Sequence, residues 1–277
     1  MINRDLKLWR NVGVAALMTA ATACGEAGGG HAGEAGEGAV EARPPAGASG
    51  EGGPGGESGH AGGEAGEAGV ASSYAGLSGD ALVGLHLQQL KGFLLLAERL
   101  NAENRQEEAS VLVGQGVLEA YEEKAAEFGG FDASKVRAAA DGAGASAQLA
   151  PKLREAEMSI DTARARLSLN HADLTARMVD IAAGIYQSVN QPDFADPTEY
   201  QHSLGAALAA KDALVAGRDA MRAHNAAAYD EAVAEVDRLI ALWPQTTAPE
   251  HPTPYRDVLR QASRVRLALS PFLDATG

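Results

Sequence analysis

The pattern of hydrophobic and polar residues along this 277-residue chain changes near residue 77. Before that point there is one short apolar run, at 12–23, and then a long stretch of Gly, Glu and Ala with no periodicity. After it, apolar residues recur every three to four positions, which is the spacing of one face of an α-helix. No segment shows the alternation of a half-buried strand. The pattern predicts an all-α domain at 74–277, behind a disordered N-terminal segment.

The first helix is expected at 79–103, and its apolar residues cover a wide arc. An arc of this width is typical of a central helix that is buried against several neighbours. The residues that form it are Leu82, Val83, Leu85, Leu87, Leu90, Phe93, Leu94, Leu96 and Leu100.

Capping residues predict where the later helices begin and end. Asn104 and Glu107 form a capping-box-like pair at the start of a second helix, which ends near Gly129. The clearest start signal is Asp196-Pro197, an N-cap carboxylate followed by a proline at the first helical position. Further helices are expected at 132–141, 146–168 (with Pro151 in its first turn), 170–189, 196–223, 226–243 and from 253 onward.

About seven such helices, joined mostly by short loops, favour antiparallel neighbours and therefore an antiparallel helical bundle. The composition agrees, because aromatic residues make up only 5% and the apolar content is mostly Ala, Leu and Val. The formal net charge of −14 repels phosphate backbones, so no nucleic acid partner is expected. No apolar run reaches the roughly 18 residues that a membrane-spanning helix needs.

The N-terminus has the three parts of a cleaved export signal, predicted at 1–23. A basic region precedes the apolar run at 12–23, which is too short to span a bilayer as a helix. Small residues, Ala21 and Ala23, then stand at the −3 and −1 positions before Cys24. The basic residues are Arg4, Lys7 and Arg10.

The run Ala21-Thr22-Ala23-Cys24 resembles the lipobox of bacterial lipoproteins, in which the cysteine becomes the first mature residue and carries the lipid. Ala21 stands where Leu is usual, and Ala21-x-Ala23 also fits an ordinary signal peptidase that cuts the same bond. The resemblance implies lipidation of Cys24, a membrane partner through that anchor, and a periplasm-facing place in the cell envelope. Gly25 after the cysteine favours the outer membrane by analogy.

Residues 24–73 are predicted to form a disordered acidic tether. They hold 18 of the 33 glycines and eight Glu against one Arg. Such a segment buries too little apolar surface to offset the entropy lost on ordering. The tether serves as a spacer, and the further alternative is loose recruitment of divalent ions by its Glu residues with His31 and His60.

The sequence contains no catalytic motif, so a non-enzymatic protein without catalytic residues is predicted. The single cysteine, Cys24, excludes thiolate metal sites and thiol catalysis within the helical domain. Bundles build metal sites from inward Glu and His, and the candidates for a divalent metal here are His86 and His202. The alternative for each is a partly buried structural histidine. Glu122-Glu123 is expected on a solvated helix face, and no other cofactor is predicted.

One local resemblance concerns protein partners. The stretch from Tyr229 to Pro244 is similar to the second helix of a tetratricopeptide repeat, although the chain has no 34-residue period. The resemblance implies a scaffold of helical hairpins. A generic amphipathic helix is the other interpretation of this stretch.

A second resemblance concerns metal. The acidic leader followed by Gly84-Leu-His86 resembles a group of helical envelope proteins, some of which carry two His near the positions of Leu112 and Gln115. It implies a metal-linked envelope role. Imelysin-like iron-handling lipoproteins share the exported helical layout, although their Gly-x-His-x-x-Glu motif ends in Gln89 here.

The sequence thus predicts a non-enzymatic cell-envelope lipoprotein whose tethered helical domain binds a ligand, with an accessory role in metal handling or uptake as its most specific form. The alternative is a helical-hairpin scaffold for an envelope protein. A closed bundle with a polar pocket would favour the ligand, and an open concave stack would favour the scaffold. An enzyme would need two buried carboxylates that face each other in one cleft.

Overall fold

The computed structural model describes residues 70–142, 146–191 and 194–273. Within these ranges every regular element is helical. The described residues also contain one isolated antiparallel bridge, between Asn190 and Ala195. The prediction of an all-α fold is therefore confirmed for the described part of the chain.

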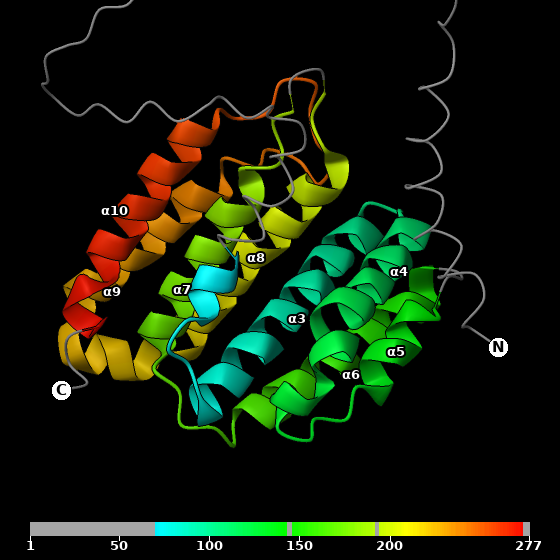
Figure 1. Ribbon diagram of the computed structural model, residues 1–277, viewed down its shortest axis with the longest axis horizontal. Helices are drawn as coiled ribbons and strands as arrows, with labels where there is room; N and C mark the ends of the chain where they lie inside the picture. Colours follow the sequence, from blue (N-terminus) through cyan, green and yellow to red (C-terminus); the bar gives the residue numbers. More distant parts are fainter. Residues whose placement is uncertain (1–69, 143–145, 192–193, 274–277) are drawn as a thin grey trace, which may run out of the picture. The chain divides into compact units, whose positions relative to one another are not determined.

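Most of the helices follow one another through short connections, and the longer links are 187–196 and 241–254. Helices α7, α8, α9 and α10 run alternately up and down (Figure 1). A helical turn at 70–74 comes first. In chain order the elements are α3 (Gly79–Ala102), α4 (Gln106–Gln115), the π-helix η1 (Gly116–Tyr121), the 3₁₀ segment η2 (Glu122–Phe128), α5 (Ser134–Ala140), α6 (Ser146–Arg164), α7 (His171–Tyr186), α8 (Pro197–Ala216), α9 (Arg218–Ile240) and α10 (Tyr255–Leu273).

The predicted signal peptide at 1–23, the predicted lipidation site Cys24 and residues 25–69 of the predicted tether lie outside the described residues. The last residues of that tether, 70–73, belong to the helical turn at 70–74. Of the helices that the structure does describe, none combines the length and the hydropathy needed to cross a bilayer.

Helix α3 is the central element of the bundle. It packs against α4 and α6 on one side and against α7 and α8 on the other (Figure 1). Its buried residues surround the whole helix and include the polar Gln88 and Lys91. The wide apolar arc of the sequence predicts this position, and the prediction is confirmed. Helix α10 completes the bundle against α7 and α9.

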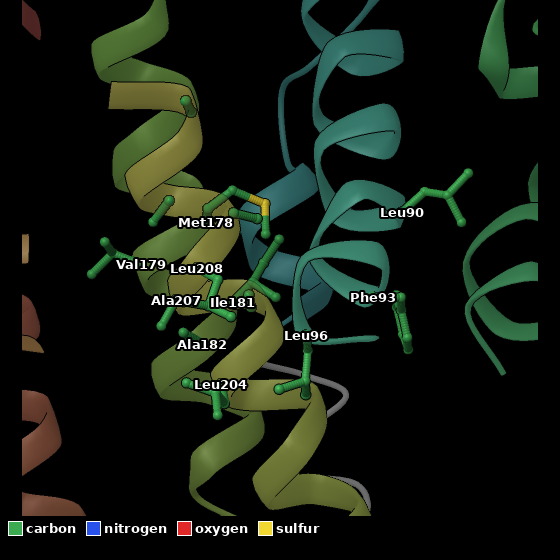
Figure 2. Packing of buried hydrophobic residues seen from close by; sticks show 14 of the residues in the cluster. Leu90, Phe93, Leu96, Met178, Val179, Ile181, Ala182, Leu204, Ala207 and Leu208 are labelled. Carbon is green, nitrogen blue, oxygen red and sulfur yellow. The ribbon is translucent and has the colours of Figure 1, made fainter. Parts of the chain in front are cut away.

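The core between α7 and α8 is built from medium-sized and small side chains. Figure 2 shows Met178 and Ile181 of α7 beside Leu204 and Leu208 of α8, whereas Leu90 of α3 points away from them. All five are buried. Between the two leucines α8 is mostly alanine and glycine, and short side chains let its neighbours approach closely.

Helices α3 and α8 come so close that their backbones touch at Gly92 and Gly205. A Cβ atom at Gly92 would lie 2.7 Å from the carbonyl oxygen of Gly205, and one at Gly205 would lie 3.0 Å from the oxygen of Gly92. A side chain at either position would push the helices apart, because a close-packed interior has no free space to receive it.

Polar side chains tie α3 to α6 and α8 next to this crossing. Lys91 Nζ lies 2.6 Å from Oδ1 of Asp161 and 2.9 Å from Oδ1 of Asp212. Arg164 Nη1 lies 2.7 Å from Asp212, to which Gln88 also donates at 3.0 Å. Burial would raise the pKa of Asp212, but these partners outweigh it and hold the pKa below its usual range. Removing one partner of such a network leaves a buried charge unpaired, at a cost of about 3–5 kcal/mol.

Two predicted caps are confirmed, and Asn170 caps the helix that was expected from residue 170. Asn170 accepts hydrogen bonds from the backbone N–H groups of residues 172 and 173 at the start of α7. Asp196 does the same for residues 198 and 199 at the start of α8, with a proline at the first position. Gly129 ends η2 in the left-handed conformation, with a φ of 59°.

One predicted helix start and one predicted position within a helix are wrong. Asn104 is not an N-cap; it has a φ of 63° in the link between α3 and α4, a left-handed conformation that asparagine tolerates better than most residues. Helix α4 accordingly begins later, at Gln106. Pro151 lies inside α6, which begins at Ser146, so it is beyond the first turn.

Helix α8 ends at Ala216, not near residue 223. Gly217 turns the chain tightly against the start of α7, where a Cβ atom would lie 2.5 Å from Cβ of His171. The break expected near residue 225 exists as a kink inside α9, where Asn225 has φ −155° and ψ 97°. Its side chain accepts a hydrogen bond from the backbone N–H of Ala228 at 3.1 Å, as an N-cap would.

The predicted second helix is not uniform. After α4 it continues as the π-helix η1 and the 3₁₀ segment η2, and Lys124 leaves helical geometry with φ −125° and ψ 19°. At the start of η1, a Cβ atom on Gly116 would lie 2.6 Å from Cγ of Phe93. A π-helix changes which side chains share a face, and such segments are frequent at functional sites.

Replacing Gly92 by alanine should destabilise the bundle, because the methyl group would meet the backbone of Gly205 at 2.7 Å. We expect the free energy of unfolding in urea to fall by about 1–3 kcal/mol, even though alanine is intrinsically the better helix former. Gly114→Ala on α4 is the matched control, since a Cβ there would meet only Cβ of Ala140, at 4.0 Å. Equal effects of the two substitutions would contradict the close contact.

Candidate functional site

A pocket of about 820 Å³ lies along one face of α3. Its lining residues on this helix are spaced by three or four positions, so they share a face. They extend from Leu82 to Leu96, a distance of about 21 Å at 1.5 Å per residue. A volume of this size is within the range of roughly 300–1,000 Å³ that is common for small-molecule sites. The lining residues from α3 are Leu82, His86, Gln89, Phe93 and Leu96.

Several other elements complete the pocket. One wall comes from η1 and η2, which supply three carboxylates and one lysine. The facing wall comes from α7 and α8, with Ile181, Ile185, Glu199 and His202 among its residues. The helical turn at 70–74, here called the strap, covers one side through Val70, Ala71 and Tyr74.

His86 is nearly fully buried, with 1% of its surface exposed. Its Nε2 lies 2.7 Å from Oε2 of Glu127, so Nε2 donates to the carboxylate and Nδ1 carries the lone pair. Nδ1 is buried and has no hydrogen-bond partner among the described residues. Burial lowers the pKa of His86, and the contact with Glu127 offsets this only in part. At neutral pH His86 is therefore a neutral imidazole with a vacant acceptor.

His202 lines the same pocket from α8, with its ring centroid 5.1 Å from that of Phe93. Its Nδ1 lies 3.8 Å from Oε2 of Glu119, beyond hydrogen-bond distance. Its Nε2 is buried and has no partner in the described part of the chain. Burial lowers the pKa of His202 to about 4. Each of these unsatisfied buried polar atoms costs the folded state about 1–3 kcal/mol.

Three carboxylates, Glu119, Glu123 and Glu127, line one wall at intervals of four residues. Burial and the charge of Glu123 raise the pKa of Glu119. Glu199 adds a fourth carboxylate from the facing wall, whereas Lys124 is the only lysine or arginine among the lining residues. Since both histidines are neutral near pH 7, the lining carries an excess of negative charge.

The strap is held in place by contacts at Tyr74 and its neighbour. The Tyr74 hydroxyl donates to Oε1 of Gln89, and burial raises the pKa of Tyr74, so this group stays a phenol. Arg177 of α7 donates from Nη1 to the carbonyl oxygen of Ser73 at 2.6 Å. Lys124 Nζ lies 5.1 Å from the Tyr74 ring centroid, a cation–π arrangement that links the strap to η2.

The structure brings His86 and His202 into one pocket but does not join them in a metal site. Phe93, which contacts His202, lies seven residues from His86 on α3, or about 10 Å along the helix. Within the described residues no three His, Cys, Asp or Glu side chains are arranged to hold a metal ion. His31 and His60 of the tether lie outside those residues.

Glu119, Glu123, Glu127 and Tyr74 line the pocket without having been predicted from the sequence. Glu123 is exposed, as expected for the Glu122-Glu123 pair, yet it also lines the pocket wall. A signal for the carboxylates was present, because side chains four residues apart on a helix are neighbours. Tyr74 had no comparable signal, since it stands where the tether ends.

A second carboxyl pair lies outside this pocket, between α3 and α6. Burial and the neighbouring Glu98 raise the pKa of Glu157 to about 7. Its Oε1 is buried without a hydrogen-bond partner among the described residues. Neither glutamate lines the pocket. An enzyme would need two facing carboxylates in one cleft. The pair formed by Glu98 and Glu157 does not lie in the pocket described above.

Comparison with protein-family models, with curated proteins and with solved structures finds no match for the chain. The resemblances noted in the sequence stay predictions, and function has to be argued from the chemistry of the pocket.

Titration of His202 should make the stability of the protein depend on pH. Its pKa is about 4 in the folded state against 6.5 for an exposed histidine. Below pH 6.5 the unfolded chain therefore binds a proton that the folded chain refuses, and stability is lost as pH falls toward 4. This loss of unfolding free energy, on the order of 2–3 kcal/mol, should be absent in His202→Leu.

The quantity to measure is the difference in unfolding free energy between the wild type and His202→Leu, by urea denaturation at pH 7 and at pH 4.5. We expect this difference to shift in favour of the variant at the lower pH. His251→Leu, which changes an exposed histidine, is the control and should show no such shift. A difference for His202→Leu that is the same at both values would rule out a buried neutral imidazole.

Proposed function

We propose that this chain is a non-enzymatic cell-envelope protein, anchored through a lipid on Cys24, whose helical domain binds a small ligand in the pocket beside α3. The observation that carries the proposal is the pocket itself, about 820 Å³ in volume and lined by two imidazoles with vacant buried nitrogens. Pockets with an apolar lining and a few convergent polar groups are typical of small-molecule sites.

The closed form of the bundle supports a ligand over a protein-interaction scaffold. A scaffold would need a continuous exposed apolar groove. The large exposed apolar side chains of the described residues are instead distributed over α4, α6, the α7–α8 connection, α8 and α10; they are Val111, Met158, Phe194, Val215, Leu259 and Leu267.

An accessory role in metal handling is the most specific form of this proposal that the sequence suggested. Its support is the acidic tether with His31 and His60, together with His86 and His202 in the pocket. The described residues lack a group of three metal ligands. A divalent metal therefore belongs in any binding panel as one chemical class among several.

Binding in the pocket should raise the melting temperature of the purified protein, because a ligand that binds only the folded state stabilises it. The panel is hexanoate, hexanol, hexylamine, glucose and zinc chloride. At least one class should raise the melting temperature of the wild type. Ala206→Phe, which places a ring on a lining residue of α8, should abolish that shift.

Leu82→Trp is the second filled variant, because Leu82 is only half-buried and a larger side chain there disturbs the core less. A folded variant is recognised by an unchanged helical circular dichroism spectrum. The proposal fails if no class shifts the wild type, or if the shift survives in both filled variants.

Substituting Cys24 by serine should release the protein from membranes, because serine cannot carry the thioether-linked lipid that anchors bacterial lipoproteins. In a bacterial host, the wild type should be recovered in the membrane fraction and Cys24→Ser in the soluble fraction. Each acyl chain contributes about 0.8 kcal/mol per buried CH₂, so the redistribution should be nearly complete. Membrane recovery of both forms would contradict lipidation at this residue.

A further inference from the structure

We propose that the pocket takes a linear aliphatic polyamine, a methylene chain that carries two or more ammonium groups. The inference rests on the proposed function, because it names the ligand class for the same pocket.

The first argument is the charge of the pocket wall. Glu119, Glu123 and Glu127 stand on η1 and η2, and Glu199 adds a fourth carboxylate from α8. Lys124 is the one lysine or arginine of the lining. An anionic ligand would be repelled, and a neutral ligand would gain no charge pairing with the carboxylates. A ligand with several positive charges matches them.

The second argument is the spacing of the carboxylates. Intervals of four residues correspond to about 6–8 Å along the segment, at a rise of roughly 1.5–2.0 Å per residue. Two amine nitrogens joined by three or four methylenes are about 5–6 Å apart when the chain is extended, given ordinary bond lengths. Each ammonium group of such a chain would thus meet a carboxylate in turn.

The third argument is that the pocket also has an apolar part. Phe93, Leu96, Leu112, Ile181 and Ile185 line it and are suited to cover the methylenes between the charged groups. The elongated face of α3 likewise suits a linear molecule better than a compact one.

Buried acceptors provide the fourth argument. His86 is 1% exposed, lines the pocket and has an unpartnered Nδ1. A neutral imidazole nitrogen accepts a hydrogen bond from an ammonium N–H, whereas it has nothing to offer a carboxylate. His202 Nε2 provides a second vacant nitrogen at the same pocket.

The protein already holds one alkylammonium group of its own in this place. Lys124 Nζ lies 5.1 Å from the ring centroid of Tyr74, on the segment that carries the carboxylates. A polyamine would compete with this side chain for the same ring and the same negative charge. Removing the Lys124 ammonium should therefore strengthen polyamine binding.

The test is isothermal titration calorimetry of the purified protein with spermidine, putrescine and butylamine as probes. The expected order of affinity is spermidine, then putrescine, then butylamine, with about a fivefold or greater loss for each ammonium removed. Affinity should fall as salt is added, since charge pairs at the rim are screened. Equal affinities for the three amines would overturn the proposal.

Two pocket variants locate the binding. Glu119→Gln and Glu123→Gln should each weaken spermidine binding by about five- to tenfold, because a charge-assisted contact is lost. Glu107→Gln, which changes an exposed glutamate on α4 outside the pocket, is the control and should bind as the wild type does. Binding that survives both pocket substitutions would assign spermidine to the acidic surface or the tether and overturn the proposal.

A gain of affinity is the sharpest result. Lys124→Met should bind spermidine about two- to tenfold more tightly than the wild type. Lys135→Met removes an exposed ammonium that pairs with Glu155 outside the pocket, and should have no effect. Weaker binding by Lys124→Met would contradict the competition.

The outcomes separate this inference from the function on which it rests. Absence of spermidine binding, together with a pocket-dependent shift from another class in the melting panel, overturns the polyamine and leaves a ligand-binding protein. Absence of every response overturns both.

Discussion

The contact between Gly92 of α3 and Gly205 of α8 is the constraint on which the rest of the bundle depends. Because the two backbones touch, residues next to the crossing are brought together without freedom to adjust: Phe93 meets the ring of His202 at 5.1 Å, and Lys91 reaches the carboxylate of Asp212 at 2.9 Å. One contact therefore places both a wall of the pocket and the buried charge network. A larger side chain at the crossing would move this wall of the pocket outward and lengthen the ion pairs of the buried charge network.

The second determinant is the irregular segment that faces this crossing. A regular helix from Gln106 to Phe128 would rotate each residue by a constant angle, so a single stripe would face α3. The π-helix η1 and the kink at Lys124 break that rotation within the segment that carries Glu119 and Glu127, whose side chains line the pocket although both are exposed. Gly116 makes the break compatible with packing, since only a residue without a side chain fits against Phe93.

The sequence predicts the helices well because caps and periodicity are local. Asn170 and Asp196 act within three residues of their own position, so their roles can be recognised from the sequence alone. The pocket is not local, because it joins the strap, α3, η1–η2 and α8 from distant parts of the chain. His86 could be identified as inward-facing from its apolar helix, but its pairing with Glu127, 41 residues away, depends on a π-helix that periodicity does not reveal.

Two titratable groups, His202 and Glu157, make the stability of the bundle depend on pH in opposite directions. Acidification below pH 6.5 costs stability at His202, whose pKa is lowered to about 4, whereas it restores stability at Glu157, whose pKa is raised from 4.5 to about 7. The two effects oppose each other between pH 4.5 and 6.5, so the fold tolerates moderate acid better than the titration of His202 alone would allow. Near neutral pH His86 and His202 stay uncharged, and the negative charge of the pocket comes from carboxylates alone. A ligand with permanent positive charge is favoured by such a pocket, because its histidines add no competing charge.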